Sequence, residues 1–227
     1  GQQLQSLLGL GLLPLLAFLG GALTTTLVYL LGTREGGTSV TVMLLAGVAI
    51  TTLSGAVIGL LTYLADDQML RNLSLWQMGS LAAGKPVDVG LALLTLVALL
   101  WLFMRDANPL NALLLGEGEA RHLGVNVQCL KRRLILLTAA GVGVAVAVAG
   151  MIGFVGLVVP HLVRLLAGPN HVRLLPLSAL LGAALLLGAD MLARTLLAPA
   201  EMPVGIITAL LGAPFFIWLL VKSRRTL

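Results

Sequence analysis

The topology of the chain depends on residues 150–168, which read GMIGFVGLVVPHLVRLLAG. Gly150, Gly153 and Gly156 open this stretch and Pro160 follows, so residues that interrupt helices gather here. The preceding residues 134–149 carry no charge, and the combined run 134–159 exceeds the ~20 helical residues that cross a bilayer core. Either one long helix crosses here, or two helices meet at a glycine-rich break near 150–156.

The distribution of lysine and arginine separates these two alternatives. One unbroken helix would divide these cations seven against seven between the two sides of the membrane. A break near 150–153, with 154–166 crossing back as a short span, divides them eleven against three. Cytoplasmic loops of membrane proteins carry an excess of Lys and Arg, so the broken helix is the predicted arrangement.

The composition is that of a polytopic membrane protein. Hydrophobic residues make up 59% of the chain, charged residues 10%, and the mean hydropathy is +1.05. Soluble domains have about 45–50% apolar and about 25% charged residues. The 27 glycines and the long apolar runs favour packed helices over a barrel. The cations behind the net charge of +5 lie in short loops, where they set orientation, so nucleic acid is not an expected partner.

We therefore predict an all-α, polytopic transmembrane helical bundle of about seven spans, forming a single domain over residues 1–227. The N-terminus is expected outside and the C-terminus inside. Leu70, Leu73 and Trp76 recur at helical spacing and predict a short amphipathic helix at the surface. Residues 110–123 predict one or two short helices that end at Gly124. The predicted spans are 7–31, 40–64, 89–104, 134 to the break, 154–166, 174–192 and 204–221.

Enzyme motifs are absent from the sequence: there is no Walker A loop, HExxH, CxxC or GxSxG. His122, His161 and His171 lie in separate segments without metal-ligand spacing, so a loop or capping role is predicted for each. His161 keeps a functional alternative because it follows Pro160. The single cysteine, Cys129, excludes an internal disulfide.

Three polar features have two interpretations each. Asp190 and Arg194 share a helix face, and their spacing favours a local ion pair over an arginine offered to an external partner. Arg71 could likewise serve an external partner, but an interfacial anchor is the favoured interpretation. The mixed charges of residues 110–124 suit either a protein partner or a self-packed loop.

Three stretches resemble the FecCD-type permeases, the membrane subunits of bacterial ABC importers for iron–siderophores, haem and vitamin B12. They are GEGEARHLGVNV (116–127), GMIGFVGLVVPHLVRLLAGPNHVRLLPLSALLGA (150–183) and LLGADMLARTLLAPAEMPVGIITALLGAPFFIWLL (186–220), and WQMGSL (76–81) also fits. The family fold has ten helices, and this chain resembles it from about the fourth, so we expect an N-terminally truncated form.

The resemblance implies a transport subunit, not an enzyme, in the bacterial inner membrane, with a cytoplasmic C-terminus. It implies a second copy of the permease, two ATPase subunits that hold ATP, a periplasmic binding protein and surrounding lipid, and no cofactor on this subunit. For Arg194 it favours docking of the periplasmic binding protein over a local ion pair with Asp190. It also implies that Arg71 is a second docking residue. Segment 110–124 becomes the coupling loop for the ATPase, and the broken helix a part of the translocation region. The implied coupling residues are Leu115, Glu117, Glu119, Ala120, Arg121 and Gly124, and those of the break are Gly150, Gly153, Gly156 and Pro160.

The transported substrate is expected to be haem, because LRNLSLWQMGSLAA (70–83) is most similar to haem permeases. Ferric siderophore and cobalamin are the alternatives within the family. A secondary transporter without an ATPase would need intramembrane acids, and Asp190 is the only candidate. A membrane scaffold without transport is the remaining class.

Overall fold

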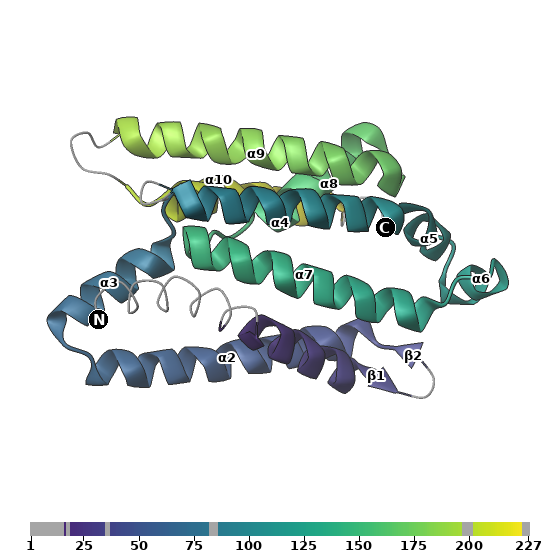
Figure 1. Ribbon diagram of the computed structural model, residues 1–227, viewed down its shortest axis with the longest axis horizontal. Coiled ribbons are helices and arrows are strands. Elements are labelled where there is room, and N and C mark those ends of the chain that lie inside the picture. The colour runs from purple at the N-terminus through teal and green to yellow at the C-terminus, as the bar shows by residue number, and fades with distance from the viewer. Residues whose placement is uncertain (1–15, 17–18, 35–36, 82–85, 197–201, 224–227) are drawn as a thin grey trace. The chain divides into compact units, whose positions relative to one another are not determined.

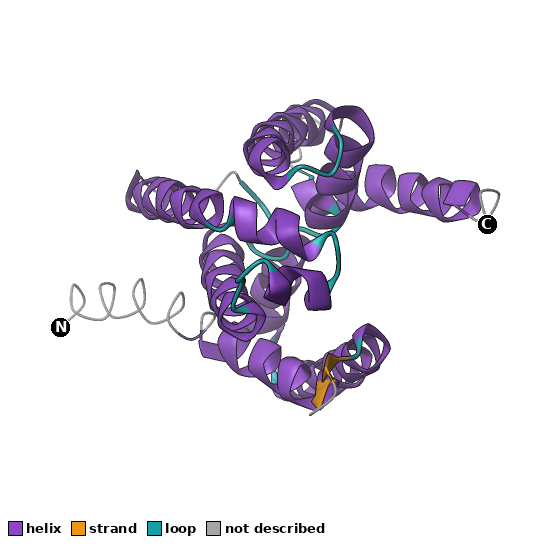
Figure 2. Ribbon diagram, turned by 90° about the vertical axis from the view of Figure 1, so that its right-hand side faces the viewer, coloured by secondary structure: helices purple, strands orange, loops and turns teal. Residues whose placement is uncertain are grey.

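The computed structural model describes residues 16, 19–34, 37–81, 86–196 and 202–223 (Figure 1). The chain divides into two compact units, residues 1–74 with 133–147 and residues 75–132 with 148–227. Figure 2 shows that helices and short loops make up nearly all of the described chain. The described strands are β1 (Thr33–Arg34) and β2 (Gly37–Thr38), which pair antiparallel as a small hairpin. The all-α prediction is therefore confirmed.

The helices follow the predicted spans closely. Within the described residues, four helices are long and apolar enough to cross a membrane, and the apolar helices Leu19–Gly32, Val155–Ala167 and Val204–Trp218 are shorter. Together they match the predicted seven, although part of the first span lies outside the described residues. The labelled helices are α2 (Val40–Leu64), α3 (Asp67–Met78), α4 (Pro86–Arg105), α5 (Ala107–Leu113), α6 (Glu117–His122), α7 (Val127–Ala149), α8 (Val155–Ala167), α9 (His171–Leu196) and α10 (Val204–Ser223).

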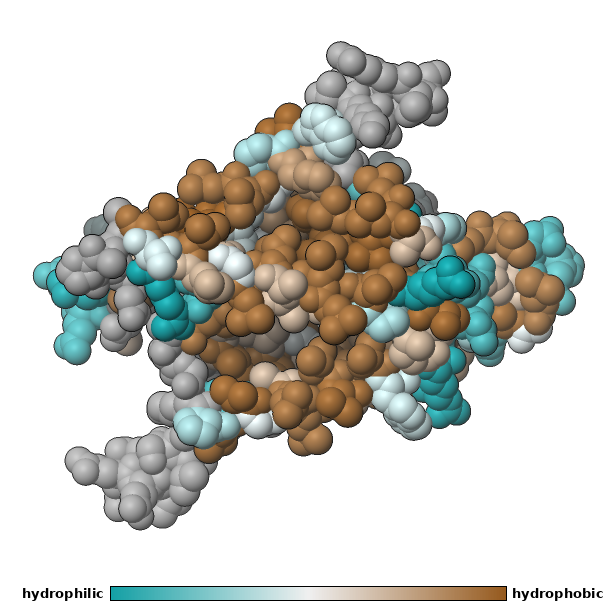
Figure 3. Space-filling model, turned by 90° about the horizontal axis from the view of Figure 1, so that it is seen from above, coloured by the Kyte–Doolittle hydropathy of each residue, from teal (hydrophilic) through white to brown (hydrophobic). Residues whose placement is uncertain are grey.

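The spans expose apolar side chains over their lengths. Leu94 on α4, Leu180 on α9 and Leu210 on α10 are 70%, 68% and 66% exposed. Figure 3 shows hydrophobic residues covering large continuous areas of the surface. Soluble monomers rarely expose apolar patches of this extent, so the surface suits a lipid bilayer.

Helices α8, α9 and α10 form the core of the second unit. Val159 and Val163 of α8 pack with Leu174 near the start of α9. Ala189 and Ala193 near the end of α9 pack with Val204 and Ile207 of α10. Because α9 takes part in both clusters, it fixes the position of the other two helices.

The broken helix is confirmed, with a narrower break than predicted. α7 ends at Ala149 and α8 begins at Val155, and both Gly150 and Phe154 adopt positive φ, 71° and 66°. The prediction was wrong for Gly156 and Pro160, which lie inside α8. Pro160 is the sixth residue of α8, past the N–H groups that lack helical partners, so α8 continues through it at the cost of one interior hydrogen bond.

Two further predictions about the polar segments are confirmed. The predicted surface helix is α3, and residues 107–122 form the two short helices α5 and α6. Gly124 follows the second of these with φ of 84° and donates its N–H to the carbonyl of Arg121. Glycine adopts this left-handed conformation without steric cost, so it can end the helix there.

Candidate functional site

The end of α3 and the helix break form one junction through backbone contacts. Ser80 N donates to the carbonyl of Ala149 at 2.9 Å, and Met151 N donates to the carbonyl of Trp76 at 3.4 Å. The carbonyl of Trp76 also accepts from Gly79 N at 3.2 Å. These bonds satisfy backbone groups that the break leaves without helical partners, as an apolar environment requires.

Glycines allow the backbones at this junction to approach. A Cβ at Gly150 would lie 2.3 Å from the carbonyl oxygen of Trp76, and a Cβ at Gly205 would lie 2.1 Å from that of Met78. No side chain fits at such distances. Gly150 therefore has two roles. It ends the helix, and it allows close backbone packing against a segment more than 70 residues earlier in the chain.

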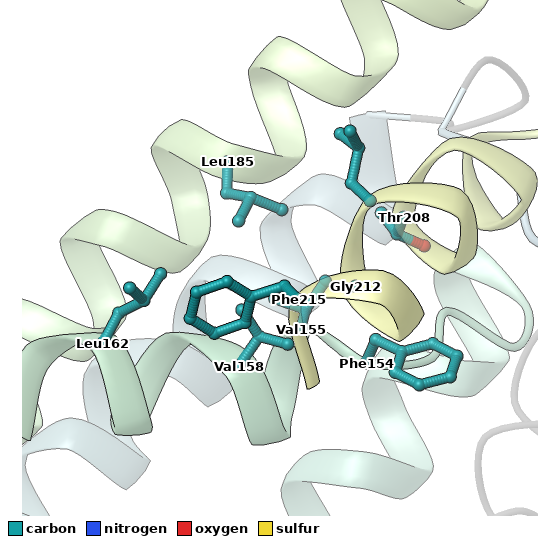
Figure 4. A pocket seen from close by; sticks show the side chains of 9 residues that line it. Phe154, Val155, Val158, Leu162, Leu185, Thr208, Gly212 and Phe215 are labelled. Atoms are coloured by element: carbon teal, nitrogen blue, oxygen red, sulfur yellow. The ribbon is translucent and has the colours of Figure 1, made fainter. Parts of the chain in front are cut away.

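A small apolar cavity lies behind the break (Figure 4). It has a volume of about 170 Å³ and is lined by Phe154, four residues of α8 and α9, and four of α10. Thr208 is the polar side chain of the lining, and its hydroxyl donates to the carbonyl of Gly205 at 3.1 Å. Pockets for drug-sized ligands measure about 300–1,000 Å³, so this cavity is too small for haem or a siderophore.

A larger open pocket lies on the face formed by the end of α3, the break and α10. Its volume is about 520 Å³. Its lining consists of apolar and small residues with one amide, namely Gln77, Met78, Met151, Gly205, Ile206, Ala209, Leu210, Ala213 and Pro214. The break therefore borders a surface large enough to contact a bulky molecule.

Residues 110–124, the coupling segment, present apolar side chains between charged ones. Leu114, Leu115 and Leu123 are 49%, 66% and 63% exposed. Glu119 is exposed as well. Only Leu115 of these three leucines was among the predicted partner residues. The others are visible in the sequence as apolar residues at the ends of the short helices, but their exposure required the structure.

Ion pairs hold α6 in place within this segment. Lys131 Nζ lies 2.6 Å from Glu117 Oε1, and Arg121 Nη2 lies 3.7 Å from Glu117 Oε2. Ala120 is fully buried, so its side chain serves internal packing, and its coupling role stays a prediction. The charges of Glu117 and Arg121 partly satisfy each other, which fits the self-packed alternative for these two residues.

Helix α5 is joined to the start of α9 by side-chain amides. Asn111 Oδ1 accepts from His171 N at 2.8 Å and lies 3.0 Å from His171 Nδ1. Asn111 Nδ2 donates to Asn170 Oδ1 at 3.0 Å. The capping role predicted for His171 is consistent with this position. The part played by Asn111 was missed, because no local pattern links residues 60 positions apart.

Arg194 occupies the last turn of α9, inside the helix and not in the following loop. Its Nε lies 2.8 Å from Asp190 Oδ2, and the arginine side chain is 48% exposed while the aspartate is 18% exposed. The local pair predicted from the spacing is present. Arg71 is exposed on α3. Arg71 belongs to the first compact unit and Arg194 to the second.

The described residues contain no group of three or more His, Cys, Asp and Glu side chains that could hold a metal ion. His122 is exposed at the end of α6, and His161 is half-buried within α8. His161 does not lie at a helix interruption, since α8 continues past Pro160. The argument for a functional His161 therefore loses its basis.

Comparison with known proteins gives consistent matches. The chain is 51% identical over 209 residues to the hemin transport system permease protein HmuU of Yersinia pestis, covering 92% of this chain and 62% of HmuU. It is 46% identical over 204 residues to the vitamin B12 import system permease protein BtuC of Vibrio cholerae, covering 90% of this chain and 61% of BtuC. The chain thus spans less than two thirds of the length of these relatives.

A solved structure and a family model agree with these matches. The structure, described as an inward-facing conformation of a metal-chelate type ABC transporter, aligns with a TM-score of 0.79 and 33% identity, covering 94% of this chain and 74% of that chain. The model of the FecCD transport family matches residues 3–222. Since that match covers almost the whole sequence, the chain belongs to the FecCD transport family.

Proposed function

We propose that this chain forms the membrane-spanning permease part of a bacterial ABC importer that carries haem across the inner membrane. The observation that carries the proposal is the 51% identity to a hemin transport permease over 92% of the chain. The permease itself is a transport subunit, and ATP hydrolysis takes place on a separate ATPase subunit. It binds no cofactor of its own.

The coupling segment is the proposed contact with the ATPase. Two short helices joined by tight turns stand between the spans α4 and α7, and exposed Leu114, Leu115 and Leu123 offer them an apolar docking surface. The ion pair between Glu117 and Lys131 ties α6 to the first turns of α7. A helix held in this way can pass a displacement to the spans without bending.

Arg194 and Arg71 are the proposed contacts with the periplasmic binding protein. A half-exposed guanidinium at the end of α9 can bind a carboxylate of that protein with two parallel hydrogen bonds. This placement puts the C-terminal end of α9 outside and the C-terminus of the chain in the cytoplasm. The eleven-to-three division of the cations supports the same orientation.

The transport path is proposed to lie between two copies of the permease. The small apolar cavity of about 170 Å³ cannot hold haem. The open pocket of about 520 Å³ beside the break offers a face of α10 that a second copy could complete. Lipid would then cover the exposed leucines of the remaining helix faces.

Reconstitution of the full-length permease with its ATPase subunits and binding protein in liposomes tests this function. We expect the loaded binding protein to stimulate ATP hydrolysis when it carries haem, and haem to enter the liposomes only with ATP. Parallel reactions with cobalamin and with a ferric siderophore identify the substrate. Cobalamin is the second candidate, because 46% identity links the chain to a vitamin B12 permease.

An ATPase variant that cannot hydrolyse ATP provides the control against secondary transport. Haem uptake that continued with this variant under an ion gradient would refute the ABC assignment. Asp190 is a poor coupling acid for such a transporter, because it is paired with Arg194 at 2.8 Å in the last turns of its helix. A scaffold without transport would show neither uptake nor stimulated hydrolysis.

A further inference from the structure

Helix α9 extends from the coupling segment at one end to Arg194 at the other. Its 26 residues give a length of about 39 Å at 1.5 Å per residue. A bilayer core is about 30 Å thick, so the two ends of one α9 reach both faces of the membrane. His171 begins the helix beside α5, and Arg194 lies in its last turn.

The side-chain amide of Asn111 in α5 takes part in capping the start of α9. The first N–H groups of a helix lack acceptors within it. Here Asn170 Oδ1 accepts from Val172 N at 3.0 Å, as an ordinary N-cap would, while His171 N donates to Asn111 Oδ1 at 2.8 Å. The cap of α9 is thus shared between its own chain segment and a residue 60 positions earlier.

The hydrogen bonds of Asn111 constrain both the distance and the relative orientation of α5 and the start of α9. Its Oδ1 faces both the backbone N and the Nδ1 of His171, and its Nδ2 donates to Asn170 Oδ1. Donor and acceptor of one short planar side chain are therefore both engaged with the turn before α9. A displacement of α5 that kept these bonds would have to carry the start of α9 with it.

Apolar packing ties both ends of α9 to its neighbours, near the start to α8 and near the far end to α10. Leu174 packs with α8, and Ala189 and Ala193 pack with α10 close to Asp190. A shift of α9 would change the packing of both helices and the position of the Asp190–Arg194 pair. Packed elements of this kind convert small shifts at one site into a second discrete arrangement.

We propose that Asn111 is a positioning residue that fixes the coupling segment to α9, so that α9 links ATPase contact at one face to binding-protein docking at the other. This inference rests on the proposed function. Coupling between two sites is reciprocal, so nucleotide on the ATPase should change the affinity for the binding protein, and docking should change nucleotide affinity by the same factor.

The test measures that factor in the full-length permease, assembled with a hydrolysis-deficient ATPase in nanodiscs. The dissociation constant of the haem-loaded binding protein is measured without nucleotide and with saturating ATP. We expect the two values to differ by about tenfold or more in the wild type, within the usual range for allosteric coupling. In Asn111→Ala the difference should fall below about threefold, while the ATPase still copurifies and the nucleotide-free affinity stays within about twofold.

The matched control is Asn126→Ala. Asn126 Oδ1 accepts from Cys129 N at 3.0 Å at the start of α7, so this variant also loses a helix cap but no bond between α5 and α9. It should keep the wild-type ratio. Asn111→Asp keeps an acceptor for His171 N but loses the donor to Asn170 Oδ1, so its ratio should lie between those of Asn111→Ala and the wild type.

A wild-type ratio in Asn111→Ala would overturn the inference, and so would an equal loss in Asn126→Ala. If Asn111→Ala does not assemble, Asn170→Ala removes the acceptor of Asn111 Nδ2, and its ratio decides in the same way. ATP-dependent haem uptake in the liposome assay with the active ATPase, together with no nucleotide-dependent difference in affinity in the wild type, would overturn the inference and leave the proposed function standing. Failure of the wild type to bind the ATPase or take up haem would overturn the proposed function itself.

Discussion

Replacement of Gly150 by alanine should destabilise the protein although it adds only one methyl group. The φ of 71° is left-handed, which costs a residue with a Cβ about 1–2 kcal/mol. The new Cβ would also lie 2.3 Å from the carbonyl oxygen of Trp76, so that backbone must move. The carbonyl accepts hydrogen bonds from Met151 N and Gly79 N, each worth about 0.5–1.5 kcal/mol. Loss of both brings the expected destabilisation to about 2–5 kcal/mol.

Gly153→Ala is the matched control for this variant. Gly153 lies in the same break, outside the left-handed region, and a Cβ there meets no heavy atom within 4 Å. We expect it to cost less than about 1 kcal/mol, as an ordinary substitution without a clash does. Both variants can be compared by denaturant unfolding of the full-length protein in detergent, with tryptophan fluorescence as the signal, because Trp76 lies at the junction. Equal stability of Gly150→Ala and the wild type, or equal losses in the two variants, would refute this account of the break.

Three further predictions concern topology and partners. After Cys129→Ser, a cysteine at Arg164 or Arg173 should be protected from an impermeant reagent applied outside while one at Asp67 reacts; labelling of Arg164 and Arg173 from outside would contradict the broken-helix topology. Gly124→Val should separate ATP hydrolysis from haem uptake without loss of membrane insertion, because its φ of 84° is strained for a β-branched residue, and normal uptake would argue against the coupling role. Arg194→Glu should weaken docking of the loaded binding protein by about 1–2 kcal/mol, between the values for exposed and buried pairs, and should be partly rescued by a glutamate-to-arginine change in the partner; an affinity equal to wild type would exclude docking at this residue.

The helix break could be predicted because two independent signals indicate it, the local glycines and the distribution of cations along the whole chain. Gly150 and Gly153 interrupt the apolar run, and the division of the cations depends only on the order of the segments along the chain. The end of α6 at Gly124 was equally accessible, since a glycine after a short helix has a known conformational meaning. Pro160 was misjudged because the sequence does not show that α8 begins only five residues before it.

Features that depend on distant side chains could not be obtained in this way. Ala120 stands among exposed charged residues, and only the fold reveals that it is fully buried. The bonds of Asn111 join segments that no periodicity relates. The close approach of Gly205 to the carbonyl of Met78 is likewise a property of packing, and in the sequence Gly205 is one of 27 glycines. Such contacts are set by which helices become neighbours, and the sequence pattern of a single helix does not encode its neighbours.

The Asp190–Arg194 pair shows how the local and the functional interpretation of one residue can both hold. The aspartate is mostly buried and needs a positive partner at the membrane edge, and Arg194 Nε supplies it at 2.8 Å. A guanidinium has five N–H donors, so binding Asp190 does not by itself prevent it from binding a second carboxylate. The pair instead restricts the rotamers of a long side chain, which lowers the entropy that docking would otherwise cost. If this is correct, Asp190 contributes to affinity for the binding protein without touching it, and Asp190→Asn should weaken docking less than Arg194→Glu but measurably. An unchanged affinity in Asp190→Asn would mean that the pair serves the stability of α9 alone.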